Sequence, residues 1–293
     1  MEVRRREQLA ITGALVAAAT GALVALYARA IAGLVREWTS SPDASYGLIL
    51  LVIACAIAWQ RRVQFVKAAD GRARSNAGLG LLLAGLTIYL VGLLGADIFL
   101  TRLSSIAVLS GIVWFLAGAR AARLMAAPLV FLLMAIPLPS LLVNSVTLPL
   151  QFVASHIAES ALTLASVPVF RDGNLLTLPS ATLEVAEACS GLRSLVSLAA
   201  IGAVFAWASE RTVWRRALLV LLTVPIAIAM NGLRIAATGL MCETWGPQYA
   251  SGGWHEFTGW ITFVVSTFLL LQIGKAMSWL DRDHAWSAGV AEA

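Results

Sequence analysis

Residues 217–240 read ALLVLLTVPIAIAMNGLRIAATGL, an apolar run that carries a single charged side chain, Arg234. As an α-helix this run would rise about 36 Å, enough to cross the roughly 30 Å hydrocarbon core of a bilayer. Arg215 and Arg216 directly precede the run. Because cytoplasmic loops are enriched in Lys and Arg, the pattern predicts a transmembrane helix that begins at the cytoplasmic face.

The composition extends this interpretation to the whole chain. Hydrophobic residues make up 59% of the 293 residues and charged residues 13%, and the mean hydropathy is +0.83. Soluble domains carry about 25% charged residues, so a polytopic membrane protein follows. The formal net charge is +5. Its basic residues cluster in short loops, without a basic stripe interleaved with aromatics, so we expect the lipid bilayer and no nucleic acid as a partner.

Further apolar runs resemble the first, and the sequence predicts an all-α protein with about eight transmembrane helices. They are expected at about residues 9–34, 46–59, 77–95, 103–118, 124–138, 191–208, 217–240 and 257–273. Most of the 21 basic residues fall in the loops on one side of this arrangement. The bias places both termini in the cytoplasm.

Residues 141–185 differ from these runs. In residues 141–167 polar side chains recur every three or four positions, which favours an amphipathic helix in the outer membrane interface over a further span. Residues 171–174, Arg-Asp-Gly-Asn, are typical of a hairpin turn. Residues 167–185 are therefore predicted to form a short extended segment on the periplasmic side.

Three chemically reactive or charged side chains lie at the ends of predicted spans. Arg234 follows Arg216 by 18 residues, about 27 Å of helix rise, and so lies near the outer boundary of the bilayer. Cys189 immediately precedes the outer end of the span at 191–208, and His255 immediately precedes that of the span at 257–273. The topology therefore predicts that all three lie at one membrane face.

These three residue types together point to nucleophilic catalysis. A cysteine at a helix N-terminus near arginines has its thiolate stabilised. His255 could accept the thiol proton and later protonate a leaving amine. Arg234 could stabilise the oxyanion that forms when the thiolate attacks a carbonyl. Four neighbouring polar residues could orient these groups: Arg193, Asn231, Glu187 and Glu184.

Other interpretations remain open from the residues alone. A cysteine at a span end is often a packing residue and an arginine there often snorkels to the headgroups. The chain would then be a non-catalytic component of polysaccharide export or assembly. Cys189 could form a disulfide with Cys242, or bind zinc together with Cys242 and His255. No ligand pair has metal spacing, so we expect neither metal nor cofactor. A transporter would place its polar residues along a midplane path, not at one end of the spans.

The motifs resemble those of the exosortase family, which is related to the archaeosortases. The similarity rests on Glu-Ala-Cys-Ser-Gly-Leu-Arg at 187–193, Asn-Gly-Leu-Arg at 231–234 and His255 before the last span. Ile-Pro-Leu-Pro at 136–139, Gly173-Asn174 and Leu-Glu-Val at 183–185 also look like that family. The resemblance covers about residues 40–275 and implies one integral-membrane domain, 1–293, whose catalytic part is about 168–275.

The resemblance also implies the reaction. The cysteine, arginine and histidine of the family correspond to Cys189, Arg234 and His255. Family members are cysteine transpeptidases of the bacterial inner membrane. They cleave membrane-anchored proteins at a C-terminal sorting tail, often marked by Pro-Glu-Pro, through a thioester at the outer face. We therefore expect protein substrates of this kind, linked to surface anchoring or exopolysaccharide assembly.

Overall fold

The computed structural model describes residues 2–41, 44–69, 75–185, 192–210, 212–250 and 253–291. It is 84% helical, and the described residues include six helices long and apolar enough to cross a membrane. The predicted class, an all-α polytopic membrane protein, is confirmed. Tertiary contacts divide the chain into two compact units: unit 1, Met1–Leu138, and unit 2, Pro139–Ala293. The assignment of one domain to the whole chain stays a prediction.

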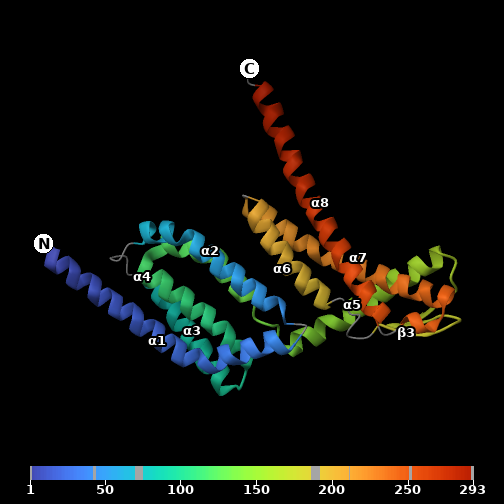
Figure 1. Ribbon diagram of the computed structural model, residues 1–293, viewed down its shortest axis with the longest axis horizontal. Coiled ribbons are helices and arrows are strands. Elements are labelled where there is room, and N and C mark those ends of the chain that lie inside the picture. Colours follow the sequence, from blue (N-terminus) through green and yellow to red (C-terminus); the bar gives the residue numbers. More distant parts are fainter. Residues whose placement is uncertain are drawn as a thin grey trace. The chain divides into compact units, whose positions relative to one another are not determined.

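The elements of both units are drawn in Figure 1. Unit 1 contains α1 (Glu2–Ser40), α2 (Tyr46–Ala68), α3 (Asn76–Leu94) and α4 (Ile98–Met134). Unit 2 contains α5 (Ser140–Leu164), β1 (Phe170–Asp172), β2 (Leu175–Thr177), β3 (Thr182–Glu184), α6 (Leu192–Ser209), α7 (Val213–Trp245), η2 (Pro247–Ala250) and α8 (Gly253–Ala291). The first three predicted spans lie in α1, α2 and α3, and the last three lie in α6, α7 and α8.

The predicted spans 103–118 and 124–138 fall largely in one element, α4, which reverses direction at Gly118. This glycine has a non-helical backbone with φ 82°, a conformation that is costly for residues with a side chain. Near the end of α1, Glu37 pairs with Arg102 and the indole of Trp38 donates to the carbonyl of Ala135. Both ends of α4 therefore lie beside the same part of α1, as two antiparallel spans require.

Glycines at heptad spacing form the interface between α3 and α4. Gly78, Gly85 and Gly92 are all buried on α3. A Cβ on Gly78 would lie 2.4 Å from the backbone nitrogen of Phe115, and one on Gly92 would lie 2.8 Å from that of Thr101. Small residues let the two backbones approach closely, which stabilises helix pairs where lipid removes the hydrophobic driving force.

Unit 2 is organised around α7, which packs against α5, α6 and α8. One core joins Leu198 of α6, Leu219 and Ala227 of α7, and Leu270 of α8. The three strands form an antiparallel sheet of order β1-β2-β3, and its buried residue Leu176 packs in a second core with α5 and α7. The extended segment and its hairpin turn were correctly predicted. Gly173, the first of two turn residues, has φ +63°, as type II′ turns require.

The buried and exposed side chains of α5 do not follow the pattern expected of an interfacial helix. Three of its polar side chains, Thr147, Gln151 and Ser155, are buried, whereas Leu141 is 84% and Leu148 56% exposed. An interfacial helix would turn its polar stripe towards water. In addition, α5 is among the six helices long and apolar enough to cross a membrane. Its helical state and period are confirmed, and its position in the interface stays a prediction.

Candidate functional site

Arg234 lies where α7 meets the beginning of α8. Its side chain is half-buried, and a Cβ on Gly259 would lie 3.3 Å from the guanidinium carbon. Because Gly259 has no side chain, the guanidinium fits against this turn of α8. Because residues four apart share one face of a helix, His255 lies one turn before this contact on the same face of α8. The group that approaches Gly259 is therefore the guanidinium of Arg234.

The two residues before Leu233 fix this part of α7 in the protein. Asn231 is 4% exposed, and Gly232 contacts α5, since a Cβ there would lie 2.6 Å from Ile157. Further along, a Cβ on Gly239 would lie 3.2 Å from Leu162, so α5 and α7 run past each other in the same direction. Gly232 thus secures the α5 side of α7 while Arg234 points towards α8.

The β1–β2 hairpin is attached to α5 by a polar network. Arg171 Nε donates to Glu159 Oε2 over 2.6 Å, and the hydroxyl of Ser155 donates to the carbonyl of Gly173 over 2.9 Å. The side-chain amide of Asn174 lies 3.4 Å from Gln151 Oε1. These contacts attach the hairpin to three residues, each four positions apart, on one side of α5.

The same asparagine holds the chain just before the predicted cysteine segment. The backbone N–H of Val185 donates to the carbonyl of Asn174 over 2.9 Å, and the amide of Asn174 donates to the carbonyl of Val185 over 3.4 Å. Val185 is 1% exposed and packs in a core with Ile235 and Ala236. The chain therefore leaves the sheet, four residues before Cys189, beside the neighbours of Arg234.

The remaining predicted site residues are placed as follows. Cys189 and Glu187 lie outside the described residues. Arg193 is in the first turn of α6 and His255 in the first turn of α8, and the description of both is limited to the backbone. Glu184 ends β3 on an exposed position, opposite Leu175. The structure thus brings together Arg234 and the segments that carry His255 and precede Cys189.

The other two cysteines contribute little to this site. Cys242 is 1% exposed in α7, and Cys55 is exposed on α2. Both are free thiols. Within the described ranges no group of three or more His, Cys, Asp or Glu residues could hold a metal ion.

Residues 38–272 match the family of transmembrane exosortases. The chain belongs to that family. No curated protein and no solved structure matches it. Family membership implies a multi-pass membrane exosortase that acts in the lipid bilayer as a protease or transpeptidase, with proteins as the suggested substrates. The match spans both units, so the exosortase region includes unit 1 as well as the helices around Arg234.

Sequence reasoning missed the side chains that hold the hairpin turn on α5. Gln151 and Ser155 lie in the stretch 141–167, which was assigned to an interfacial amphipathic helix, although they bind the turn. Asn174 was identified as a turn residue and as part of the family resemblance, without its contacts. A signal was available in the spacing of Thr147, Gln151 and Ser155, which places all three on one helix face, but spacing alone does not tell whether that face meets water or protein.

Proposed function

We propose that this exosortase is a cysteine transpeptidase that cleaves C-terminal sorting tails of exported proteins. The observation that carries the proposal is the convergence at Arg234. Its guanidinium contacts the turn of α8 that follows His255, and its neighbour Ile235 packs with Val185. Cys189 is four positions after Val185 in the chain, so chain length keeps those two positions within about 14 Å.

The reaction would proceed through a thioester. The thiolate of Cys189 attacks the carbonyl carbon of the scissile peptide bond, and Arg234 stabilises the negative charge on the oxygen. The C–N bond then breaks as His255, which holds the thiol proton, protonates the leaving amine. An acceptor nucleophile finally attacks the thioester carbonyl and releases Cys189. The charge bias of the loops supports an outer-face site in the bacterial inner membrane with both termini inside.

A partly buried arginine suits this role because its planar guanidinium holds its hydrogen-bond donors in a fixed geometry. The family supports the substrate class, a membrane-anchored protein whose tail carries a short motif such as Pro-Glu-Pro. Release or transfer of such proteins would serve surface anchoring or exopolysaccharide assembly. Asn231, Arg193, Glu187 and Glu184 are assigned supporting roles.

The test is co-expression with a reporter that ends in a Pro-Glu-Pro-type tail, followed by size on a gel. We expect wild type to shorten the reporter, Cys189→Ala and Arg234→Ala to abolish shortening, and His255→Ala to lower it by about two to three orders of magnitude. Cys55→Ala removes an exposed thiol in α2 of unit 1. This variant is the matched control and should process the reporter normally.

Membrane extraction and size-exclusion chromatography of each variant would show that it is inserted and folded. Processing by folded Cys189→Ala would overturn the cysteine mechanism. A mild effect of His255→Ala would assign the proton transfer to another group. If neither wild type nor variant shortened the reporter, a pH-dependent reaction of Cys189 with a thiol probe would separate a wrong tail from a non-catalytic assembly component.

A further inference from the structure

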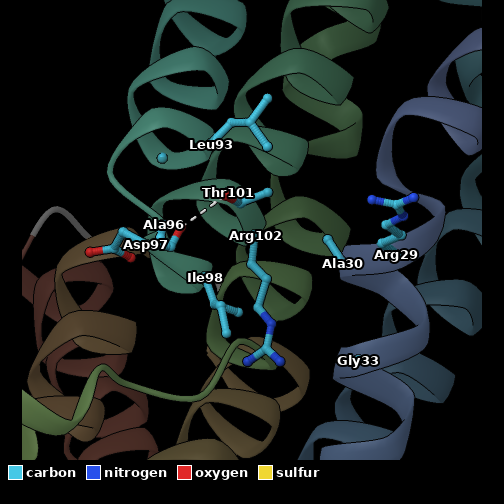
Figure 2. A pocket seen from close by; sticks show the side chains of 10 residues that line it. Arg29, Ala30, Gly33, Leu93, Ala96, Asp97, Ile98, Thr101 and Arg102 are labelled. Atoms are coloured by element: carbon cyan, nitrogen blue, oxygen red, sulfur yellow. Dashed lines mark hydrogen bonds between the residues drawn. The ribbon is translucent and has the colours of Figure 1, made fainter.

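Unit 1 contains a cavity of about 280 Å³ between α1 and the turn that joins α3 to α4. Figure 2 shows it from close by, with Arg29 and Gly33 on α1 and Arg102 on α4 around the open space. Neither arginine has a role in the proposed reaction.

Arg102 presents a buried guanidinium beside this cavity. The residue is 9% exposed, and its Nη1 lies 2.6 Å from Oε2 of Glu37. Its Nε is buried without a hydrogen-bond partner among the described residues. Gly33 lies beside this guanidinium, since a Cβ there would be in van der Waals contact with Nη2 at 3.7 Å. One carboxylate therefore uses only part of the hydrogen-bonding capacity of this side chain.

Arg29 adds a second positive charge. It is exposed and lies one turn before Gly33 on the same face of α1. Its guanidinium takes part in none of the ion pairs or hydrogen bonds found within the described ranges. Asp97, the acidic residue among those that line the cavity, caps α4 by accepting from the N–H of Leu100 over 2.9 Å. In Figure 2 its carboxylate points away from both arginines.

The position and walls of the cavity indicate an amphiphile. The 19 residues of α3 rise about 28 Å, close to the thickness of the hydrocarbon core, so the turn after α3 lies near a membrane boundary. Leu93 is 56% and Ile98 64% exposed at its rim. Guanidinium groups recognise phosphate, and exposed apolar rims at this depth face acyl chains. A soluble anion would not need such a rim.

We propose that this cavity binds the phosphate of an anionic membrane lipid. Arg102 contacts the phosphate, and Glu37 holds Arg102 in place. The exposed side chain of Arg29, whose guanidinium points away from that of Arg102 in Figure 2, turns to the phosphate on binding. The acyl chains lie along Leu93 and Ile98. This inference concerns unit 1 alone and does not depend on the proposed peptidase mechanism.

The full chain in nanodiscs of phosphatidylcholine mixed with phosphatidylglycerol provides the test. Native mass spectrometry would count the phosphatidylglycerol that stays bound after transfer to detergent. We expect wild type to retain this lipid over phosphatidylcholine and Arg29→Gln to bind it about tenfold more weakly, as loss of a charge-assisted hydrogen bond predicts. Ala30→Phe, which fills the cavity without changing a charge, should have the same effect.

Arg36→Gln is the matched control, because Arg36 is exposed on the same helix and its Nε bonds to the carbonyl of Ala32. Arg29→Gln leaves the pair between Arg102 and Glu37 intact, so it tests binding without disturbing the fold. Equal retention by wild type, Arg29→Gln and Arg36→Gln would overturn the proposal. So would thermal stabilisation by inorganic phosphate in pure phosphatidylcholine without a preference for phosphatidylglycerol, which would indicate a site for soluble anions.

Discussion

Two pairs of neighbouring elements in this exosortase are held together in different ways. In unit 1, α3 and α4 meet through Gly78, Gly85 and Gly92, whose missing side chains let the backbones touch. In unit 2, α5 holds the sheet with the buried polar side chains Gln151 and Ser155, which bind the β1–β2 turn. The first pair depends on close packing and the second on hydrogen bonds.

This difference follows from what each pair has to hold. Between two lipid-facing helices, dispersion contacts at short range are the main stabilising term, and they require small residues. A three-stranded sheet has backbone groups at its edges and turns that need polar partners. Three changes would test this contrast, beginning with the one expected to have the largest effect.

Gly78→Ala should weaken unit 1 strongly. The new Cβ would lie 2.4 Å from the nitrogen and 2.7 Å from the Cα of Phe115, so the helices must separate. We expect a loss of about 3 kcal/mol in the free energy of unfolding, measured by denaturant titration in detergent. Gly80→Ala on the same helix is the control, since a Cβ there meets nothing within 4 Å. Equal behaviour of the two variants would show that close approach does not stabilise this pair.

Asn174→Ala should weaken unit 2 by a smaller amount. It removes the amide that lies 3.4 Å from both Gln151 Oε1 and the carbonyl of Val185 and leaves the buried Gln151 without this partner. We expect a loss of about 1–2 kcal/mol together with lower processing of the reporter, because the segment before Cys189 loses an anchor. Asn144→Ala, at an exposed position of α5, should change neither. Full processing by Asn174→Ala would rule out a positioning role.

Gly259→Ala should affect processing with little effect on stability. Its Cβ would lie 3.3–3.5 Å from three guanidinium atoms of Arg234, so the side chain shifts by a few tenths of an ångström. We expect processing to fall about fivefold, roughly 1 kcal/mol in the activation barrier. Gly253→Ala, where a Cβ meets nothing within 4 Å, should process as wild type. If the two variants were equally active, the position of Arg234 would not limit the reaction.

Local patterns in the sequence predicted much of this structure. The apolar runs gave the helices, and Arg-Asp-Gly-Asn gave the hairpin, because turn chemistry is determined by neighbouring residues. The reversal at Gly118 falls at the predicted end of a span. Each of these features depends on a short stretch of chain, which is why a single sequence is enough to find it.

Contacts between distant residues were out of reach of the same reasoning. Arg102 and Glu37 form an ion pair although two helices separate them along the chain, and no local pattern connects them. Residues 141–167 were assigned to an interfacial helix, because helical period identifies a common face without identifying what covers it. Gly259 and Arg234 come from different helices, and their contact became evident only in the fold.

The length of α7 has a consequence for where a substrate is cut. Its 33 residues rise about 50 Å, well beyond the roughly 30 Å hydrocarbon core. At its far end Glu243 accepts hydrogen bonds from the backbone and hydroxyl of Ser180, beside the sheet. Open sheet edges are not tolerated in hydrocarbon, so we expect this end to lie in water and the bilayer surface to cross α7 near Arg234. Arg234 would then meet the sorting tail of a substrate at a fixed distance from the bilayer. The cleavage position would therefore depend on the distance from the membrane as well as on the sequence of the motif.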